Sequence, residues 1–339
     1  MVRPSILGAD VTAAHAQVAS RLAEEMEQVE RFFDEQLVSD LPEVNELCRY
    51  VERYRGKMLR PSLMMLTGMA VRGTKIDDAI NDRHRMIGAV VEMIHMATLV
   101  HDDVLDEAEI RRRGRTVNSL RGNETAVILG DYLISNAFHL CSRAGEPWIN
   151  LALGETTNTL CEGELVQLAH RDDLGLDEAR YFDIVRRKTA SLVASCCAIG
   201  ARLSGANDAL SEALREFGHD LGVAFQIQDD LLDLEGRQDV VGKSLGRDLA
   251  KGKLTLPVIL HLGAASADPK RSAAAMALVA QRDVTGLLDA MRASGSLDRA
   301  RERAMDLVAR ARGRLSLLPP GPARDFLADA AASVVRRDA

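Results

Sequence analysis

The chain has 339 residues, of which 47% are hydrophobic and 27% are charged, so extensive disorder is excluded. Aromatic residues make up only 4%, and the apolar residues are mainly types that favour helices over strands. The net charge of −7 argues against binding to nucleic acid and gives no general attraction to anionic lipid.

Helical periodicity dominates the chain, because apolar residues recur at spacings of three and four. Breaks fall at turn residues, no strand pattern is convincing, and no long linker divides the sequence. We therefore expect a single all-α domain over residues 1–339. In chain order, the expected helices cover residues 12–38, 43–54, 58–72, 82–106, 124–143, 148–171, 177–204, 208–235, 253–265, 284–294, 296–317 and 323–336.

Targeting signals are not evident. The N-terminal residues lack the apolar core of a signal peptide, and no stretch reaches the ~18 apolar residues of a membrane span. The five cysteines are odd in number and form no C-x-x-C pair, which is typical of reduced, buried thiols. We expect a cytoplasmic protein with no integral membrane segment and no nucleic-acid partner.

Two of the expected helices are apolar almost all round and yet carry a polar stripe. A buried helix tolerates such a stripe only beside a polar cavity or a bound ion. In residues 86–105 and 217–234 the stripes repeat at steps of three, four or seven, which keeps their members on one helix face. The stripe residues are Glu92, His95, Asp102 and Asp106 in the first helix, and His219, Gln226, Asp230 and Asp233 in the second.

Each stripe ends in a D-D-x-x-D cluster, at residues 102–106 and 229–233. The carboxylates of one cluster repel each other, so cations must compensate them. Carboxylate oxygens without His or Cys partners suit Mg²⁺. One such cluster is most simply a solvated helix end, but two copies on apolar helices favour metal binding. The predicted metal residues are Asp102, Asp103, Asp106, Asp229, Asp230 and Asp233.

Basic residues accompany the acids, and acids for Mg²⁺ together with Lys and Arg are typical of a diphosphate site. Their number suggests room for more than one phosphate-bearing substrate. A P-loop, a G-x-G-x-x-G after a strand and a G-x-S-x-G elbow are all missing from the sequence. The basic residues in question are Lys57, Arg60, Arg111, Arg112, Arg113, Arg115, Lys188, Lys243, Lys251 and Lys253.

Five segments in order resemble motifs of the trans-isoprenyl diphosphate synthase (polyprenyl synthetase) family. Residues 55–61 resemble G-G-K-x-x-R-P, residues 101–118 and 225–233 the two aspartate-rich motifs, 188–189 the K-T motif, and 242–253 a lysine-bearing stretch. The resemblance implies the isoprenoid synthase fold, a helical bundle around a central cavity. It also implies a homodimeric, Mg²⁺-dependent prenyltransferase that condenses isopentenyl diphosphate with an allylic diphosphate such as farnesyl or geranylgeranyl diphosphate.

The resemblance also implies roles for individual residues. Asp102, Asp106 and Asp229 would hold Mg²⁺ against the allylic diphosphate, with Asp103, Asp230 and Asp233 close by or ligating through water. Lys188 and Lys253 would neutralise the leaving diphosphate, and Thr189 and Gln226 would lie beside the nascent cation. Isopentenyl diphosphate would bind Lys57, Arg60 and His95, and Lys243 would also bind substrate.

Two positions depart from the family pattern. Arg55 replaces the first glycine of the first motif, and Gly114 comes one place late in the usual R-R-G. Counting from the first aspartate assigns Arg111 to the allylic diphosphate and Arg112 to isopentenyl diphosphate. Counting back from Gly114 assigns Arg112 and Arg113 instead. We favour the first count, because it leaves residues 116–118 in register.

Product length should depend on Ala97, which lies five residues before Asp102, about one helical turn deeper. In the family, a bulky aromatic residue there closes the pocket for short products, so alanine favours a long all-trans chain. The alternatives are a short-chain geranylgeranyl or farnesyl diphosphate synthase, a class I terpene cyclase, and a non-catalytic helical interaction protein. The second D-D-x-x-D and the Lys57/Arg60 pair argue against the cyclase. Retention of all six aspartates argues against the non-catalytic protein.

Overall fold

The computed structural model describes residues 13–112, 114–236 and 246–336. The chain forms two compact units, which are described separately here. Unit 1 comprises residues 1–157, 195–215 and 315–330, and unit 2 comprises residues 158–194, 216–314 and 331–339. The single domain expected over residues 1–339 stays a prediction.

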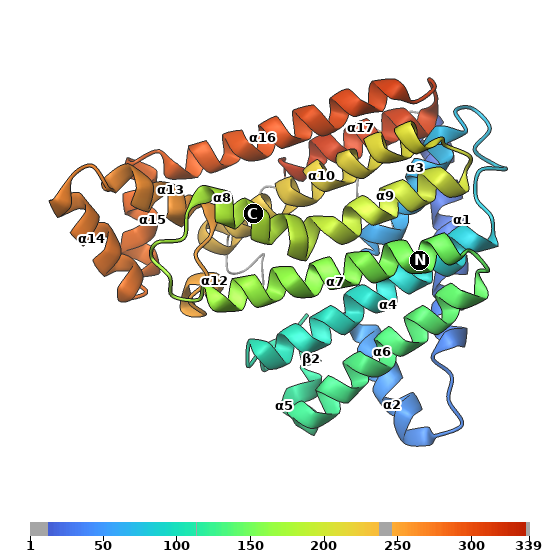
Figure 1. The fold of residues 1–339 in the computed structure, drawn as a ribbon, viewed down its shortest axis with the longest axis horizontal. Coiled ribbons are helices and arrows are strands. Elements are labelled where there is room, and N and C mark those ends of the chain that lie inside the picture. Colours follow the sequence, from blue (N-terminus) through green and yellow to red (C-terminus); the bar gives the residue numbers. More distant parts are fainter. Residues whose placement is uncertain (1–12, 113, 237–245, 337–339) are drawn as a thin grey trace. The chain divides into compact units, whose positions relative to one another are not determined.

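Unit 1 is built around a long central helix, α4 (Asp82–Leu105), which lies alongside α6 (Asn123–Arg143) and also packs against α1 and α3 (Figure 1). Its side chains are buried on most faces, as the nearly continuous apolar sequence predicts. Before α6, the unit contains α1 (Ala13–Gln36), α2 (Pro42–Val51), a 3₁₀ turn (Glu52–Tyr54), α3 (Leu59–Val71), α4, β1 (Ile110–Arg111), β2 (Gly114–Arg115) and α5 (Val117–Arg121).

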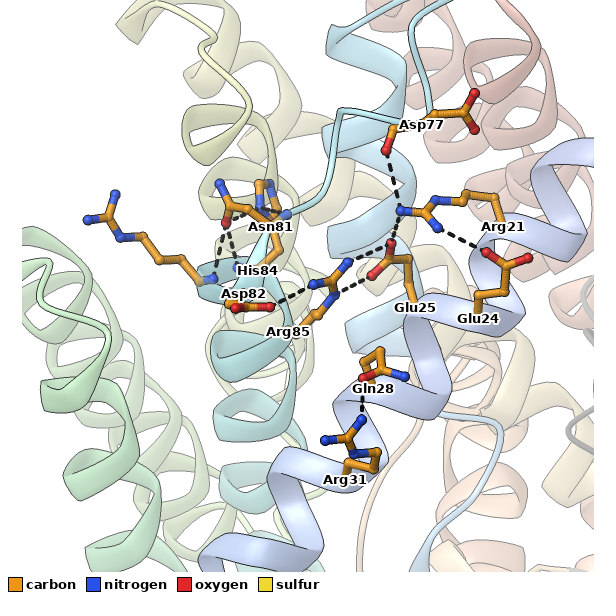
Figure 2. Close-up of polar contacts among 11 residues, drawn as sticks. Arg21, Glu24, Glu25, Gln28, Arg31, Asp77, Asn81, Asp82, His84 and Arg85 are labelled. Carbon is orange, nitrogen blue, oxygen red and sulfur yellow. Dashed lines mark hydrogen bonds and ion pairs between the residues drawn. The ribbon is translucent and has the colours of Figure 1, made fainter.

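The start of α4 is fixed by polar contacts with α1 and with the preceding loop (Figure 2). Asn81 and His84 form a capping box, which satisfies backbone N–H groups at the helix start. Glu25 is buried and accepts hydrogen bonds from Arg85 at 2.6 and 3.1 Å, while Arg21 lies 2.5 Å from it. These contacts set the position of α4, whose opposite end carries the first aspartate cluster.

Unit 2 contains α8 (Glu178–Val185), a π-helical turn (Arg186–Ala190), α12 (Arg247–Ala250), α13 (Leu256–Ala265), α14 (Pro269–Ala280), α15 (Val284–Ala293) and α16 (Ser296–Arg314). Here α13 packs against α14, α15, α16 and α8. Four longer helices each have one part in either unit, and a 3₁₀ turn (Leu315–Leu317) follows α16. These helices are α7 (Pro147–Ala169), α9 (Ser191–Leu203), α10 (Asp208–Glu235) and α17 (Pro322–Val334).

The predicted all-α class is confirmed, with several local differences, among them the short helices α5 and α12, which lie outside the expected ranges. Helix α14 was not expected, because alanines and few large apolar residues give it little periodicity. The β1–β2 hairpin was also not expected, since strands of two residues carry no alternation. The helix expected over 177–204 is interrupted by the π-helical turn at 186–190. No helix in the described ranges is long and apolar enough to cross a membrane.

Candidate active site

The first aspartate cluster lies where α4 ends. Asp102 and Asp106 are partly exposed, and the Asp106 N–H bonds the Asp102 carbonyl at 2.8 Å. Carboxylates at a helix C-terminus face the negative end of the helix dipole, so they need nearby cations. Asp103 differs from its two neighbours, because it is only 1% exposed.

Arg111 supplies the cation for Asp103. The β1–β2 hairpin turns the chain back, so that Arg111 Nε donates to both Asp103 oxygens at 2.9 Å and Nη2 lies 2.7 Å from Oδ1. Burial opposes the charge of Arg111, but the hydrogen bond to Asp103 and the negative charges of Asp103 and Asp102 together outweigh burial and raise the pKa of Arg111. Asp103 is therefore held in an ion pair inside the protein, whereas Asp102 and Asp106 remain partly exposed.

Arg112 stands at the hairpin turn, with a φ of 46° in the left-handed region. Its guanidinium donates to the Tyr54 carbonyl and lies against Gly56. A Cβ on Gly56 would come within 2.4 Å of Arg112 Nη2, so the guanidinium lies directly over the glycine. Arg113 lies outside the described residues. The contacts bring Arg112 to the R-G-K segment and Arg111 to the aspartates.

The unexpected Arg55 fits its position. Its backbone φ of −59° is ordinary, so no glycine is required there. Its guanidinium lies 4.2 Å from the centre of the Phe33 ring and forms an ion pair with Asp34 on α1. The departure from the family pattern thus adds a contact to α1 without straining the backbone.

Basic side chains surround the polar stripe of α4. Burial, followed by the charges of Arg60, Arg112 and Arg111, holds the pKa of His95 well below its usual value. Glu92 is 2% exposed, and burial raises its pKa against the charges of Arg60 and Arg112. Arg60, Arg111 and Arg112 therefore all act on His95, and their charges favour its neutral form. Lys57 is exposed on the preceding loop.

In unit 2, the π-helical turn carries the K-T pair. Lys188 Nζ forms an ion pair with Glu164 and donates to Gln167 Oε1 at 2.9 Å. Helix α7 and the π-helical turn approach closely here, since a Cβ on Gly163 of α7 would lie 2.6 Å from the backbone nitrogen of Lys188. A π-helical turn often marks a functional site, and this one holds both residues that the resemblance singled out.

The second aspartate cluster belongs to the last turns of α10. Asp229 is exposed, whereas Asp230 is 3% exposed and accepts hydrogen bonds from Tyr181 at 2.6 Å and Gln226 at 2.9 Å. Gln226 in turn accepts one from Thr189 at 2.9 Å. Burial, with the charge of Asp248 second, raises the pKa of Asp230 well above its usual value.

Asp233 holds the segment that leads to Lys253 by accepting hydrogen bonds from its backbone. Its two oxygens accept the backbone N–H groups of Arg247 at 3.3 Å and Asp248 at 3.1 Å. The Asp248 carbonyl then accepts the Lys253 N–H at 2.9 Å. Lys243, the other predicted substrate residue of this stretch, lies outside the described residues.

Comparison with known proteins identifies the family. The family model described as polyprenyl synthetase matches residues 41–291. The chain belongs to the polyprenyl synthetase family. As a member of this family it is a trans-prenyltransferase, which confirms the predicted enzyme class over the terpene cyclase and the non-catalytic protein.

Three relatives place this prenyltransferase within the family. The octaprenyl diphosphate synthase of Escherichia coli (strain K12) is 34% identical over 93% of this chain and 97% of its own. A short chain isoprenyl diphosphate synthase of Methanothermobacter thermautotrophicus is 34% identical over 84% of this chain and 87% of its own. The crystal structure of a polyprenyl synthase from Caulobacter crescentus CB15, complexed with calcium and isoprenyl diphosphate, has a TM-score of 0.86. That structure is 30% identical and covers 98% of this chain and 100% of its own, so the isoprenoid synthase fold is confirmed.

The aspartates of the prenyltransferase fit a hard divalent cation by their chemistry, since all their donor atoms are carboxylate oxygens. Within the described ranges, however, no group of three His, Cys, Asp or Glu side chains is placed so that it could hold a metal ion alone. Mg²⁺ commonly keeps waters and takes ligands from substrate phosphates.

The sequence did not indicate the partners of the inner carboxylates. Tyr181 lies in an ordinary amphipathic helix, and nothing in its spacing links it to Asp230. The sequence pattern likewise gave no indication that Asp233 bonds the backbone of residues 247–248. Ala97 is fully buried on α4 together with Val90 and Met93, and its effect on product length stays a prediction.

Proposed function

We propose that this protein condenses isopentenyl diphosphate with farnesyl or geranylgeranyl diphosphate to give a long-chain all-trans polyprenyl diphosphate, with Mg²⁺ as cofactor. The observation that supports this most directly is that Arg60, Arg112 and Arg111 all act on His95 of the α4 stripe, where burial and their charges lower its pKa. Arg60, Arg112 and His95 offer positive charge and a hydrogen bond to a diphosphate, while the neighbouring Arg111 pairs with Asp103.

Isopentenyl diphosphate is proposed to bind Lys57, Arg60, Arg112 and His95. Arginine guanidinium groups suit phosphate oxygens, because they donate in a planar fork. A neutral His95 adds a donor or acceptor without a further positive charge. Of the two ways of counting the arginines, Arg112 suits isopentenyl diphosphate and Arg111 the allylic diphosphate, since Arg111 pairs with Asp103.

The proposed Mg²⁺ ligands are Asp102, Asp106 and Asp229, because these are the more exposed members of the two clusters. When bound, Mg²⁺ neutralises charge on the departing diphosphate. Lys188, Lys253 and Lys243 are assigned to the same diphosphate charge.

The remaining steps concern the allylic cation. Thr189 and Gln226 are proposed to turn their oxygen dipoles toward it. The double bond of isopentenyl diphosphate attacks the cation, and a proton is then lost to the departed diphosphate, since no dedicated protein base stands out. Apolar residues around the tail exclude water, which would otherwise quench the cation.

A long product is proposed on the basis of Ala97. Overall identity does not decide the length, because the octaprenyl and the short chain relatives are both 34% identical to this chain. A short-chain product is the alternative. A homodimer is also proposed, and α6 is its candidate interface because Ile128 is 67% exposed there and Val127 is exposed beside it.

The direct test is incubation with labelled isopentenyl diphosphate, farnesyl or geranylgeranyl diphosphate, and Mg²⁺, followed by mass spectrometry of the dephosphorylated products. A series of chains longer than the primer is expected. EDTA should abolish this extension, and added Mg²⁺ should restore it. Recovery of unextended primer under all conditions contradicts the proposed function.

A further inference from the structure

Tyr181 is a buried tyrosine to which none of the roles above is assigned. It lies on α8, seven residues before Lys188, and is 4% exposed. Its ring packs edge-on against Phe182, with the ring centres 5.6 Å apart. Its hydroxyl donates to Asp230 Oδ2 at 2.6 Å, which is a short hydrogen bond between two buried groups. A buried hydroxyl aimed at one carboxylate oxygen fixes that carboxylate in place.

The hydrogen bond of Tyr181 is the first of a chain. Asp230 Oδ1 accepts from Gln226 Nε2 at 2.9 Å, and Gln226 Oε1 accepts from Thr189 Oγ1 at 2.9 Å. The Gln226 amide thus turns its nitrogen toward Asp230 and its oxygen toward Thr189. Tyr181 and Asp230 therefore determine which way the Gln226 amide faces.

The backbone around this chain leaves little freedom. Gly222, one turn before Gln226 on α10, lies against Ala190 of the π-helical turn, directly after Thr189. A Cβ on Gly222 would come within 2.8 Å of the Ala190 Cα. The two elements that carry Gln226 and Thr189 are thus in direct contact, and their spacing is fixed by the glycine.

We propose that Tyr181 is a positioning residue for the prenyl transfer. It holds Asp230, and through Asp230 it holds the Gln226 amide, so that the Gln226 carbonyl and the Thr189 hydroxyl stay in one fixed arrangement. This rests on the proposed function, in which Gln226 and Thr189 face the allylic cation. Dipoles oriented in advance stabilise a developing charge without having to reorganise during the reaction.

Tyr181→Phe removes one hydroxyl and keeps the ring against Phe182. We expect kcat for condensation to fall ~10-fold, with the KM for isopentenyl diphosphate changed less than ~2-fold. Ser204→Ala is the matched control: it also removes a buried hydroxyl, which bonds His84 Nε2 at 3.0 Å and the Ala79 carbonyl at 2.9 Å beside the opposite end of α4 from the aspartates. The melting temperatures of Ser204→Ala and Tyr181→Phe should fall by similar amounts. The kcat of Ser204→Ala should nevertheless stay within ~2-fold of the wild type.

A double-mutant cycle with Gln226→Ala separates positioning from a general structural effect. If Tyr181 acts through Gln226, Tyr181→Phe should cause no further loss of kcat in the Gln226→Ala background. Losses that multiply in the double variant, or a Tyr181→Phe variant with the kcat of Ser204→Ala, overturn the inference and leave the proposed function intact. A wild-type protein that extends no primer overturns both.

Discussion

The two aspartate clusters have the same D-D-x-x-D sequence but different surroundings. At the end of α4, the inner carboxylate of Asp103 is paired with a cation, Arg111, at 2.7 Å. In α10, the inner carboxylate of Asp230 is bonded to neutral donors, Tyr181 and Gln226. The last carboxylate differs as well: Asp106 is the C-cap residue of α4, whereas Asp233 accepts backbone N–H groups of the segment before Lys253.

This difference indicates a division of labour. The ion pair links the first cluster to Arg111, which lies near His95 together with Arg60 and Arg112, and the latter two are proposed to bind isopentenyl diphosphate. The hydrogen-bond chain links the second cluster to Gln226 and Thr189, which are proposed to face the cation. Changes near α4 should therefore act mainly on the KM for isopentenyl diphosphate, and changes near α10 should act mainly on kcat.

The two clusters should behave alike when an outer aspartate, Asp102 or Asp229, is removed. Asp102→Ala and Asp229→Ala should each lower kcat/KM at least ~100-fold, because each removes an electrostatic contribution of several kcal/mol to the departure of the diphosphate. Asp289→Ala is the control, since Asp289 is an exposed aspartate of α15 with one weak ion pair. Steady-state kinetics give the comparison. Near-wild-type turnover in either cluster variant would exclude that aspartate as a metal ligand.

Arg60→Ala and Thr189→Val should separate the two regions. Arg60→Ala removes a guanidinium that lies near His95 and Glu92, so the KM for isopentenyl diphosphate should rise ~10-fold or more, with a smaller effect on the allylic primer. Thr189→Val should lower kcat ~10-fold and leave both KM values nearly unchanged. Kinetics with each substrate varied in turn check this. Equal effects of Arg60→Ala on the two substrates would break the proposed division.

The sequence predicted the helical fold and both clusters because their signals are local. The apolar helix over 82–105 and the spacing of Asp102, Asp103 and Asp106 can be counted along one helix. Partners far apart in sequence give no such signal. Tyr181 lies 49 positions from Asp230, and the turn that bonds Asp233 follows it by 14. The π-helical turn at Lys188 was missed for another reason: one extra residue in a turn barely changes a helical pattern.

Ala97→Phe tests whether α4 also limits the tail. Ala97 is fully buried about one turn below Asp102, and a phenyl ring there should block further prenyl units. A phenyl ring that enters the proposed tail channel costs less than the ~1–3 kcal/mol of overpacking a closed core, so the variant should fold. Mass spectrometry should show shorter products, with primer consumption within ~3-fold of the wild type. An active variant with unchanged product length would place the limit elsewhere.

The smallest expected effect concerns His95: its titration should leave no mark on the pH profile of kcat/KM. Burial and three arginines lower the pKa of His95 well below its usual 6.5, so the imidazole takes up a proton only at a pH well below that value. Between about pH 6 and 8 it should stay neutral, and kcat/KM for isopentenyl diphosphate, which reports the free enzyme, should show no step from this residue. His95→Gln keeps a neutral hydrogen-bonding group and should change kcat/KM less than ~3-fold, with the same pH profile. A change in kcat/KM near pH 6.5 that the wild type shows and His95→Gln lacks would mean that His95 titrates normally. The arginines would then not act together on one side chain, and the contrast between a charged α4 region and a neutral hydrogen-bond chain in α10 would lose its main electrostatic support.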